Sequence, residues 1–469
     1  MDKSTKIIAT VGPAVSTQKI MEDLLKAEVN VFRFNFSHGT HEEHLKKIRW
    51  AQGLMERGYR VALFADLGGP KFRLGEIEGG NIALKRGQEF VLTTRKIKGN
   101  SKGAYAPLEA VIPYVKKGDI VLLADGTVQL EVQEVKEDAI ITVVRMGGEI
   151  SSHKGINIPS RMSGISAITE KDVEDIKFAI KAGISIFALS FVGSEHDVMR
   201  AREVVKGACG GKSMIISKIE RHDAVVNFDN ILESSDAIMI ARGDLAVETP
   251  YSRVPILQKE FITKAREKCK PVITATQMLR SILFNPLPSR AEISDIANAV
   301  IDGSDALMLS EETAVARDPV HSVRVMKKVI VETERFLSKK TLIQPGGRAK
   351  DIGEQIASSA VEIACSLGAK LIITPTASGT TAMRISSRRP TAPIVAPTPC
   401  EVVYEFLNLC YGVYPIKVDV MDNFDDLINV VKATIFEKKL AKEGDLAVIT
   451  AGYPFGKPYT TNMVKVERL

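Results

Sequence analysis

Short apolar runs alternate with amphipathic stretches through most of the chain. In residues 1–66, runs of strand character at Lys6–Val11, Val29–Phe36 and Val61–Asp66 are separated by stretches with helical periodicity. Strands that alternate with helices are typical of a parallel sheet covered by helices. This first segment is therefore predicted to begin an α/β domain.

The pattern changes after residue 70. Short β-type runs then follow one another with turn residues between them and without a long helical pattern: Glu89–Thr93, Ile120–Leu123, Thr127–Val132 and Ala139–Val144. We interpret residues 70–163 as a small all-β domain of barrel type that is inserted after the third strand.

The α/β pattern resumes at Thr169. Five more strand runs follow it: Ile184–Phe191, Met214–Ile219, Ala237–Ala241, Pro271–Thr276 and Ala306–Leu309. Three strands before the insertion and five after it predict a closed (β/α)8 TIM barrel, built from residues 1–69 and 164–345. Capping-box pairs predict the starts of several helices. These pairs are Thr40/Glu43, Thr169/Asp172, Ser194/Asp197 and Ser289/Glu292.

A second α/β domain is predicted over residues 346–469. The adjacent glycines Gly346 and Gly347 mark its boundary with the barrel. Stretches with helical periodicity then separate its four predicted strands: Lys370–Pro375, Ile394–Ala396, Gly412–Ile416 and Asp445–Thr450.

Composition excludes several classes of function. The 469 residues are 45% hydrophobic and 26% charged, which is typical of a soluble globular protein. The net charge of +6 is spread along the chain without a basic block, so no nucleic-acid partner is expected. No apolar run reaches membrane-spanning length and the start lacks a secretory-signal pattern, so we expect no membrane association and a cytoplasmic location.

The five cysteines are scattered and never form a CxxC pair. They are Cys209, Cys269, Cys365, Cys400 and Cys410. This usage argues against a disulfide framework or a zinc site and fits a reducing compartment.

Charged residues stand at the ends of two neighbouring predicted strands. Lys218 and Glu220 end the run at Met214–Ile219, and Asp244 follows the run at Ala237–Ala241. Alternation along a strand places Lys218 and Glu220 on one face, at the end of a parallel sheet where ligands bind. Two carboxylates suit Mg²⁺, and a lysine beside them can neutralise charge on a reacting oxygen. The two runs by themselves favour ordinary surface ion pairs, but the rest of the sequence reverses that preference.

The second strand run has a polar face. Phenylalanines occupy its even positions, whereas Arg33, Asn35 and Ser37 occupy the odd ones. Unpaired buried polar groups are costly, so in a barrel this face must meet ligand or solvent. The alternative is a half-exposed strand in an ordinary sheet.

Other segments could bind ligands or have an ordinary structural role. The turn Asp66–Arg73 could approach a phosphate or simply lead into the insertion. Thr276 could relay a proton or cap a helix, and Lys171 could hold an anion or be solvated. Glu311 and Glu312 could cap a helix or repel anions, and Thr376–Thr381 could bind a phosphate or form a capped turn.

Together these segments resemble the pyruvate kinase family. The resemblance spans essentially the whole chain and is carried, in order, by KIIATVGPA, NFSH, GPKFR, TEKD, SF, ISKIE, ARGDL, TATQML, NPLPSRAE, DGSDALMLSEET and TASGTTA. A barrel with a β insertion after its third strand and an α/β tail also agrees with the plan of that family.

The resemblance implies phosphoryl transfer from phosphoenolpyruvate to ADP, which gives pyruvate and ATP in the last step of glycolysis. The implied catalytic residues are Lys218, Thr276 and Arg33. Substrate would be bound by Arg33, Lys218, Gly243, Asp244 and Thr276. Glu220 and Asp244 would hold Mg²⁺ or Mn²⁺. The nucleotide would lie near Asn35, His38, Arg73 and Lys171. The inserted domain would act as a lid that excludes water.

Several residues depart from the common family pattern. Lys71 replaces a glutamate that is associated with a K⁺ requirement, and Leu67 accompanies this lysine in members linked to K⁺ independence. A tethered ammonium can stand where a monovalent cation would sit, so K⁺ is not expected to be required. The family's monovalent-ion ligands, here Asn35, Ser37 and Asp66, are then expected to hold no ion. Glu311 and Ala246 replace glycines, and Glu311 adds negative charge near an anion site.

The resemblance also implies a homotetramer with a regulatory C-terminal domain. A sugar-phosphate or nucleotide effector would bind at Thr376, Ser378, Gly379, Thr380 and Thr381, and Pro458 in the last turn leaves the effector class open. One alternative is a catalytically silent homologue that binds metabolites, which the retention of Lys218, Glu220, Asp244 and Thr276 argues against. The other alternative is a different barrel enzyme of phosphoenolpyruvate or pyruvate chemistry, which would need no β lid.

Overall fold

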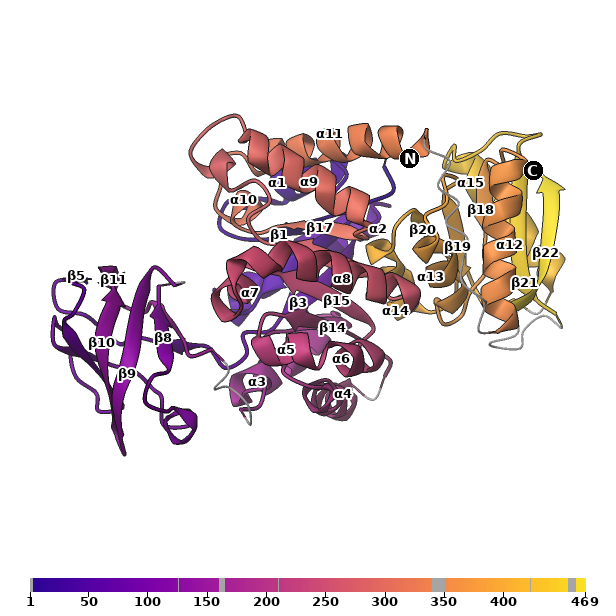
Figure 1. Cartoon of the computed structure of the whole chain (residues 1–469). Coiled ribbons are helices and arrows are strands. Elements are labelled where there is room, and N and C mark those ends of the chain that lie inside the picture. Colours follow the sequence, from indigo (N-terminus) through magenta and orange to yellow (C-terminus); the bar gives the residue numbers. More distant parts are fainter. Residues whose placement is uncertain are drawn as a thin grey trace.

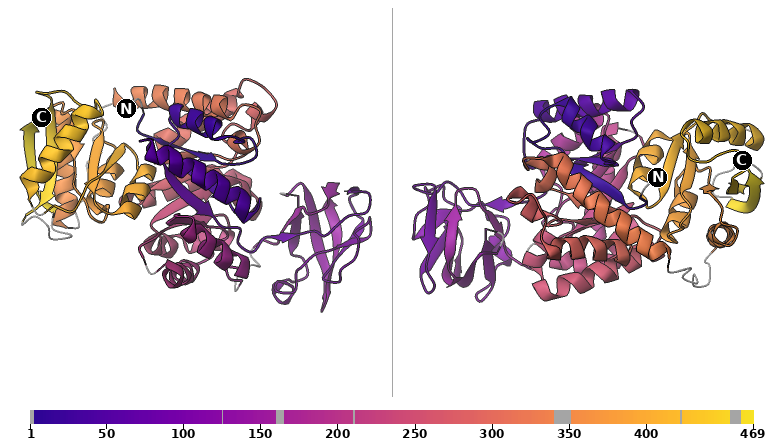
Figure 2. Two further views of the ribbon diagram at one scale, coloured as in Figure 1. Left: turned by 180° about the vertical axis from the view of Figure 1, so that it is seen from behind. Right: turned by 90° about the horizontal axis from the view of Figure 1, so that it is seen from above.

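The protein consists of a central barrel with one domain on each side of it. A computed structural model describes residues 3–124, 126–159, 165–209, 211–339, 351–421, 423–453 and 461–469. Gly346, Gly347 and Pro458 lie outside these ranges. The inserted β-rich domain and the C-terminal domain lie on opposite sides of the barrel (Figure 1), and views from behind and from above agree (Figure 2).

The predicted (β/α)8 barrel is confirmed. Eight strands form a closed sheet in which every neighbouring pair is parallel and the order around the barrel follows the chain. The strands are β1 (Lys6–Thr10), β2 (Val31–Asn35), β3 (Ala62–Asp66), β13 (Ile186–Leu189), β14 (Met214–Ile219), β15 (Ala237–Ala241), β16 (Val272–Ala275) and β17 (Ala306–Leu309). Three of the eight have the predicted bounds, and the other five are shorter because flanking apolar residues are buried beyond the hydrogen-bonded ladder.

Helices surround the barrel. They are α1 (Gln18–Lys26), α2 (His41–Glu56), α3 (Glu170–Lys181), α4 (Glu195–Cys209), α5 (His222–Val226), α6 (Phe228–Ser234), α7 (Arg242–Glu248), α8 (Val254–Glu267), α9 (Arg290–Asp302), α10 (Glu311–Ala314) and α11 (Pro319–Ser338). Short 3-10 turns occur at η2 (Tyr251–Arg253) and η3 (Arg280–Leu283). The capping boxes predicted at Thr40, Thr169 and Ser289 are confirmed. At Ser194 only the backbone half is present, because its N–H donates to Asp197 Oδ2 at 3.1 Å.

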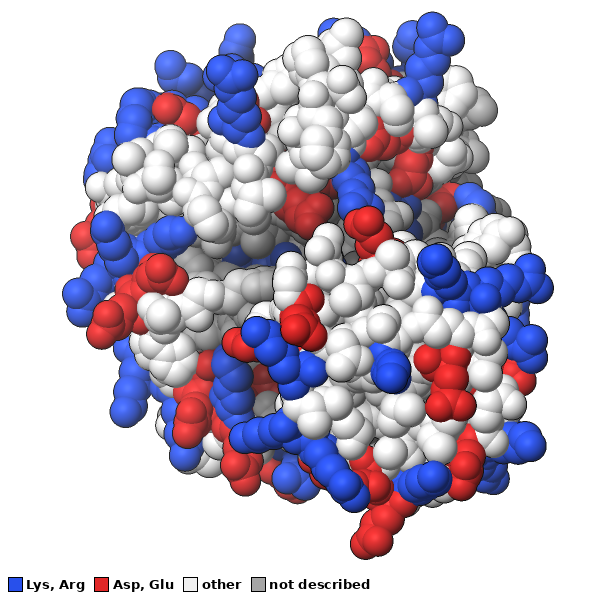
Figure 3. Space-filling view, turned by 90° about the vertical axis from the view of Figure 1, so that its left-hand side faces the viewer, with Lys and Arg blue, Asp and Glu red and all other residues white. Residues whose placement is uncertain are grey.

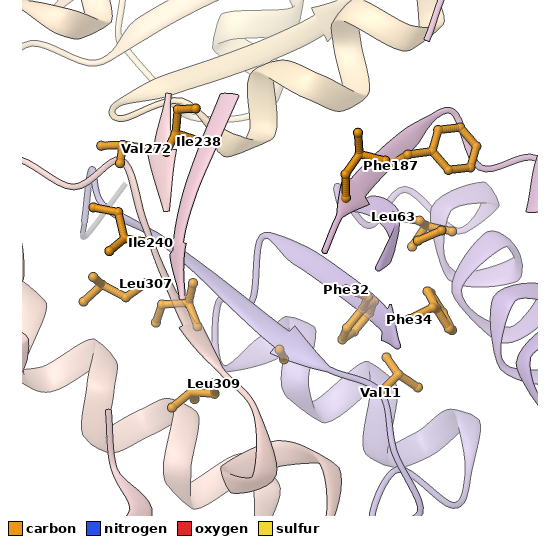
Figure 4. Packing of buried hydrophobic residues seen from close by; sticks show 14 of the residues in the cluster. Val11, Phe32, Phe34, Leu63, Phe187, Ile238, Ile240, Val272, Leu307 and Leu309 are labelled. Carbon is orange, nitrogen blue, oxygen red and sulfur yellow. The ribbon is translucent and has the colours of Figure 1, made fainter. Parts of the chain in front are cut away.

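Alternate residues of the barrel strands enter two different cores. Residues that point outward pack against the helices, as Phe32, Phe34 and Leu307 do (Figure 4). Residues of the opposite parity, such as Phe64 and Met239, fill the barrel itself. A filled barrel holds its strand ends in fixed positions, which is what a precise site requires.

The inserted domain is all-β, as predicted, and has its own hydrophobic core. Its strands are β4 (Phe72–Arg73), β5 (Asn81–Leu84), β6 (Glu89–Thr93), β7 (Gly103–Tyr105), β8 (Ile120–Leu123), β9 (Val128–Lys136), β10 (Ala139–Met146), β11 (Gly148–Ser151) and β12 (Gly155–Asn157), with a 3-10 turn η1 (Ile112–Tyr114). Seven of them form one sheet, and β5 pairs with β11. The sequence predicted β6 and β8 with these bounds, but it did not predict β4, β5, β7, β11 and β12, which have two to four residues and are too short for a clear alternating pattern.

The C-terminal domain is a five-stranded sheet with helices. Its order is β20-β19-β18-β21-β22, with four parallel strands and an antiparallel edge strand β22. The elements are α12 (Ile352–Ser366), β18 (Leu371–Ile373), α13 (Thr380–Ser387), β19 (Ile394–Thr398), α14 (Glu401–Phe406), η4 (Leu407–Leu409), β20 (Val413–Lys417), α15 (Phe424–Glu437), β21 (Leu446–Gly452) and β22 (Thr461–Arg468).

The C-terminal domain closes the lower end of the barrel. The apolar interior of the barrel continues without a break into this domain through α14 and η4, where Phe406 and Leu409 are buried. Polar contacts surround the junction. Lys6 Nζ, at the start of β1, donates to Val413 O at 2.7 Å, and Asp305 accepts from Arg389 Nη1 at 2.8 Å. The strands finish at the other end of the barrel, on the side away from the C-terminal domain (Figure 1).

Among the described residues, no helix combines the length and the hydrophobicity that crossing a membrane requires.

Candidate active site

The last inward-facing layer of the barrel is polar. Thr10, Arg33, Asp66 and Lys218 come from four different strands and follow the parity of the apolar interior residues below them. Arg33 donates through Nη1 to Thr10 Oγ1 at 3.0 Å and through Nε to Asp66 Oδ2 at 2.6 Å. Lys218 Nζ reaches the other oxygen of Asp66 at 3.1 Å. The barrel therefore ends in a connected chain of charges, and the prediction that the polar face of β2 points inward is confirmed.

Lys218 is surrounded by acceptors. Besides Asp66, its ammonium contacts Glu220 Oε1 at 2.9 Å and Ser190 Oγ at 2.6 Å. Burial disfavours the charged form, but the carboxylates of Asp66 and Glu220 outweigh it and raise the pKa of Lys218 well above its ordinary value. Burial also acts against the charge of Asp66, yet Lys218 and Arg33 lower the pKa of Asp66. The lysine is thus a fixed positive charge at neutral pH.

Glu220 and Asp244 form the acidic part of the site. Glu220 is 1% exposed, and burial together with the charge of Asp244 raises its pKa although Lys218 opposes the shift. A divalent cation between the two carboxylates would relieve that repulsion. Within the described part of the chain, no group of three or more His, Cys, Asp or Glu side chains could hold a metal. Two carboxylates are the kind of oxygen donor that suits Mg²⁺, which keeps several water or substrate oxygens in its shell.

A strained turn carries Thr276 to the same end of the barrel. Thr276 and Gln277 have φ values of 71° and 56°, which are unusual for residues other than glycine. Thr276 Oγ1 accepts from the N–H of Gly243 at 2.8 Å. Arg242 holds the turn in place, since its Nη2 donates to Thr276 O at 2.7 Å and its Nη1 contacts Asp295 at 2.7 Å. The Thr276 hydroxyl thus satisfies a backbone N–H in the first turn of α7, and it donates its own proton to Ala275 O at 2.6 Å.

Residues 2–323 match the family described as pyruvate kinase, barrel domain, and residues 354–467 match pyruvate kinase, alpha/beta domain. The chain is 42% identical to the pyruvate kinase of Thermococcus litoralis over 472 aligned residues, which cover 99% of this chain and 98% of the relative. It is also 42% identical to the pyruvate kinase of Thermotoga maritima, with complete coverage of both chains. A solved pyruvate kinase structure from Cryptosporidium parvum superposes with a TM-score of 0.92 at 36% identity, covering 100% of this chain and 96% of that one.

The chain belongs to the pyruvate kinase family. It is therefore an enzyme of the kinase class, and the resemblance predicted from the motifs is confirmed. The alternative of an unrelated barrel enzyme is excluded by these matches.

The residues expected near a nucleotide in a pyruvate kinase lie around the rim. Partial burial and the cations Arg73, Lys71 and Arg33 lower the pKa of His38. Lys171 Nζ donates to Phe36 O at 2.8 Å and to Asp175 Oδ2 at 2.6 Å, and so lies beside the end of β2.

Arg73 belongs to the inserted domain, where its Nη1 donates to His153 O at 3.1 Å. On the face that carries this domain, basic and acidic side chains are interspersed without a field of one sign (Figure 3).

The structure gives the contacts or the exposure of the positions that depart from the pyruvate kinase pattern, and of Asn35 among the expected monovalent-ion ligands. Lys71 Nζ lies 4.0 Å from Asp244 Oδ1. Asn35 Oδ1 accepts from Ser37 N at 3.1 Å. Ala246 is exposed within α7, where alanine favours a helix more than glycine does. Glu311 is exposed at the start of α10, whereas its neighbour Glu312 is buried.

The predicted effector loop precedes α13. Gly379 has φ 87°, and its N–H donates to Thr376 Oγ1 at 2.9 Å. The hydroxyls of Ser378 and Thr380 lie 2.9 Å apart, and Thr381 Oγ1 lies 2.8 Å from Thr461 Oγ1. The loop therefore gathers hydroxyl groups at the start of a helix, although several already pair with each other.

Two residues around the site, Ser190 and Arg242, were given no role from the sequence. Ser190 contacts Lys218, and Arg242 supports the Thr276 turn. Glu312, a predicted candidate for a helix cap or an anion-repelling group, accepts from the N–H groups of Leu279 and Ser310 at 3.0 and 2.8 Å. The sequence offers a signal for Ser190, which belongs to the SF motif of the resemblance. Arg242 directly precedes Gly243, but its role depends on contacts between strands.

Glu248 is expected to make stability depend on pH. It is buried at the end of α7, where Asn157 Nδ2 of the inserted domain donates to it at 3.4 Å. Burial raises its pKa to about 7, while the Asn157 hydrogen bond opposes the shift. A carboxyl group whose pKa is raised in the folded state stabilises the folded protein fully below its unfolded-state pKa of about 4.3. This stabilisation is lost as the pH rises through the folded-state pKa of about 7.

Glu248→Gln should therefore flatten the change in urea midpoint between pH 6 and pH 8. The wild-type midpoint should fall over this range by more than the variant's. Equal slopes for both proteins would contradict the prediction.

Proposed function

We propose that this chain transfers the phosphoryl group of phosphoenolpyruvate to ADP, giving pyruvate and ATP. The observation that carries the proposal is the position of the Lys218 ammonium among Asp66, Glu220 and Ser190 at the open end of the barrel. Phosphoryl transfer depends mostly on positioning and on charge neutralisation, and this geometry supplies both. The chemistry named for the relatives agrees with it.

Each side chain then has a definite task. Lys218 stabilises the charge that develops on the transferring phosphoryl group and on the enolate oxygen. Arg33 grips the phosphate with the guanidinium nitrogens that Asp66 and Thr10 orient. The N–H of Gly243 and the hydroxyl of Thr276 bind the carboxylate end of the substrate, and Thr276 belongs to the path that protonates enolpyruvate.

Glu220 and Asp244 would hold Mg²⁺ or Mn²⁺. The bound ion supplies a Lewis acid that polarises the substrate oxygens. Glu220 is kept in orientation by Lys218 and by the N–H of Phe191, which donates to its Oε2 at 2.8 Å. Asp244 lies in the first turn of α7, where the partial positive charge of the helix stabilises a carboxylate.

Asn35, His38, Arg73 and Lys171 are proposed to bind the nucleotide. Burial and neighbouring cations favour neutral His38, so it can accept or donate a single hydrogen bond without adding charge. Closure of the inserted domain would carry Arg73 towards the barrel and exclude water from the transfer.

Activity is expected without K⁺. Lys71 supplies a tethered positive charge 4.0 Å from Asp244, and Asp66 is already paired with Arg33 and Lys218. An assay in buffer free of K⁺ and Na⁺ should retain most of the wild-type rate, whereas Lys71→Glu should make the rate depend on added K⁺. An absolute K⁺ requirement in the wild type would refute this expectation.

A homotetramer and an allosteric effector belong to the same proposal. Several large apolar side chains are exposed on neighbouring segments from η2 to α10, as an interface between copies requires. They are Tyr251, Ile256, Phe284, Leu287, Ile301 and Val315. The hydroxyl-rich loop at residues 376–381 suits a sugar phosphate or a nucleotide.

The proposed reaction is tested by supplying phosphoenolpyruvate, ADP and Mg²⁺ to the purified chain and measuring pyruvate. Pyruvate should form in the complete mixture and should be lost when a chelator removes the divalent ion. If the folded wild type makes no pyruvate but still binds phosphoenolpyruvate, the chain is instead a silent metabolite-binding homologue.

A further inference from the structure

We propose that Ser190 and Phe191 act as a positioning pair that fixes Lys218 and Glu220 in their reactive arrangement. The two residues directly follow β13, the strand beside β14 in the barrel. Ser190 contacts the ammonium of Lys218, and Phe191 contacts the carboxylate of Glu220. The inference rests on the proposed phosphoryl transfer and adds two residues to its machinery.

The hydrogen bonds of Ser190 can run in one direction only. Its hydroxyl carries one proton, and Oγ lies 2.6 Å from Leu67 O, an acceptor that cannot donate. Asp66 Oδ1 is farther away, at 3.5 Å. The proton therefore goes to Leu67, and the lone pairs of Oγ remain to accept from Lys218 Nζ at 2.6 Å. Because Ser190 is only 4% exposed, no bulk water competes for this contact.

This serine is one of the acceptors around the ammonium. Among the described residues, Lys218 Nζ contacts the carboxylates of Asp66 and Glu220 and the hydroxyl of Ser190. The two carboxylates lie on strands on either side of β13. Ser190 is the neutral acceptor between them, so it sets the direction of the ammonium without adding negative charge where a phosphate must bind.

Phe191 performs the matching task for Glu220 through its backbone. Its φ of 56° lies in the left-handed region, which is a strained conformation for a bulky residue. In that conformation its N–H points at Glu220 Oε2, 2.8 Å away, and its carbonyl accepts from Arg221 Nη1 at 3.1 Å. The buried ring keeps the residue in place. The strained backbone of Phe191 therefore directs its N–H at one carboxylate oxygen of Glu220.

The pair is also packed against the segment that leads into the inserted domain. Ser190 bonds to Leu67 O, and a Cβ added to Gly69 would lie 3.1 Å from Ser190 Cβ and from Phe191 Cδ2. Gly69 has φ 62°, so a side chain there would be strained as well as crowded. The positioning pair thus connects the reacting lysine with the first turn of the lid connection.

The test compares Ser190→Ala with Ser217→Ala. Ser217 is a buried serine on β14 whose hydroxyl bonds to Ser235 Oγ at 2.6 Å, on the outward side of the strand. Ser190→Ala should lower kcat about tenfold to a hundredfold with KM for ADP unchanged within about threefold, as loss of a contact that orients a reacting group does. Ser217→Ala should keep the wild-type kcat, and both variants should have similar melting temperatures.

Two further variants at Ser190 distinguish a role of its hydroxyl in orienting Lys218 from a role in packing. Ser190→Thr keeps the hydroxyl and should recover most of kcat, whereas Ser190→Cys keeps the volume but offers a weak acceptor and should fall between wild type and Ser190→Ala. Equal kcat losses in Ser190→Ala and Ser217→Ala, or a Ser190→Cys variant as active as wild type, would overturn the proposal. An inactive wild type would instead reject the proposed reaction, so the two failures are distinguishable.

Discussion

Lys218→Met is expected to lower kcat by roughly a thousandfold, which corresponds to about 4 kcal/mol of lost transition-state stabilisation. Methionine keeps the length of the side chain but removes the one positive charge that contacts both Asp66 and Glu220. Binding of phosphoenolpyruvate should weaken much less, because Arg33 still offers its guanidinium to the phosphate. The measurement is pyruvate formation at saturating phosphoenolpyruvate, ADP and Mg²⁺.

Lys6→Met is the matched control for this variant. Lys6 is also a buried lysine in the barrel, but it lies at the opposite end and donates to Val413 O. Its replacement should leave kcat within about twofold of wild type, since no charge near the reacting atoms changes. Circular dichroism and a melting curve establish that both variants are folded. A Lys218→Met protein that retains a tenth of the wild-type kcat would remove Lys218 from the proposed mechanism.

Asp305→Ala should destabilise the folded protein by roughly 3–5 kcal/mol, because it breaks a buried ion pair and leaves Arg389 without its partner. Asp305 accepts from both terminal nitrogens of Arg389, at 2.8 and 2.9 Å. It also accepts from the N–H groups of Val272 and Tyr411, both at 3.0 Å. One carboxylate therefore holds the start of two barrel strands and the C-terminal domain together. The midpoint of urea unfolding measures the effect.

Arg384→Ala provides the comparison for an exposed pair. Arg384 makes an equally short two-point contact with Asp351, but the two side chains are 25% and 50% exposed, against 14% and 5% for Arg389 and Asp305. Its loss should cost at most about 1 kcal/mol. If the two variants shifted the midpoint equally, burial would not be what makes the Asp305 contact important.

The fold was predictable wherever the apolar runs were continuous. β14, β15 and β17 have the predicted bounds, because a polar residue directly precedes and follows each of these buried runs. The run at Ile184–Phe191 was predicted too long, since Phe191 leaves the strand at φ 56° although it stays buried. Strand β22 was missed because it is an edge strand with charged, partly exposed residues. Within the barrel, the buried residues are also the ones that pair in strands. At the ends of the barrel buried residues lie outside the strands, and at a sheet edge paired residues are exposed.

The site was predictable where its residues follow the alternation of a strand. Arg33, Lys218 and Glu220 were placed on one face by parity, and they lie there. Their connection through Asp66 required the closed barrel, which brings β3 within reach of β2 and β14. The contact between Asp305 and Arg389 joins residues 84 positions apart, and no local pattern announces it. Long-range pairing of this kind depends on the assembled fold.

The shared apolar interior has a consequence for engineering. Because α14 and η4 pack against the apolar interior of the barrel and close one end of it, the barrel is not an independent folding unit. A truncated chain that ended at residue 345 would expose the floor of its own barrel and would aggregate. A chimera that exchanges the C-terminal domain between relatives should therefore keep Phe406, Leu407 and Leu409 together with the barrel whose end they cover.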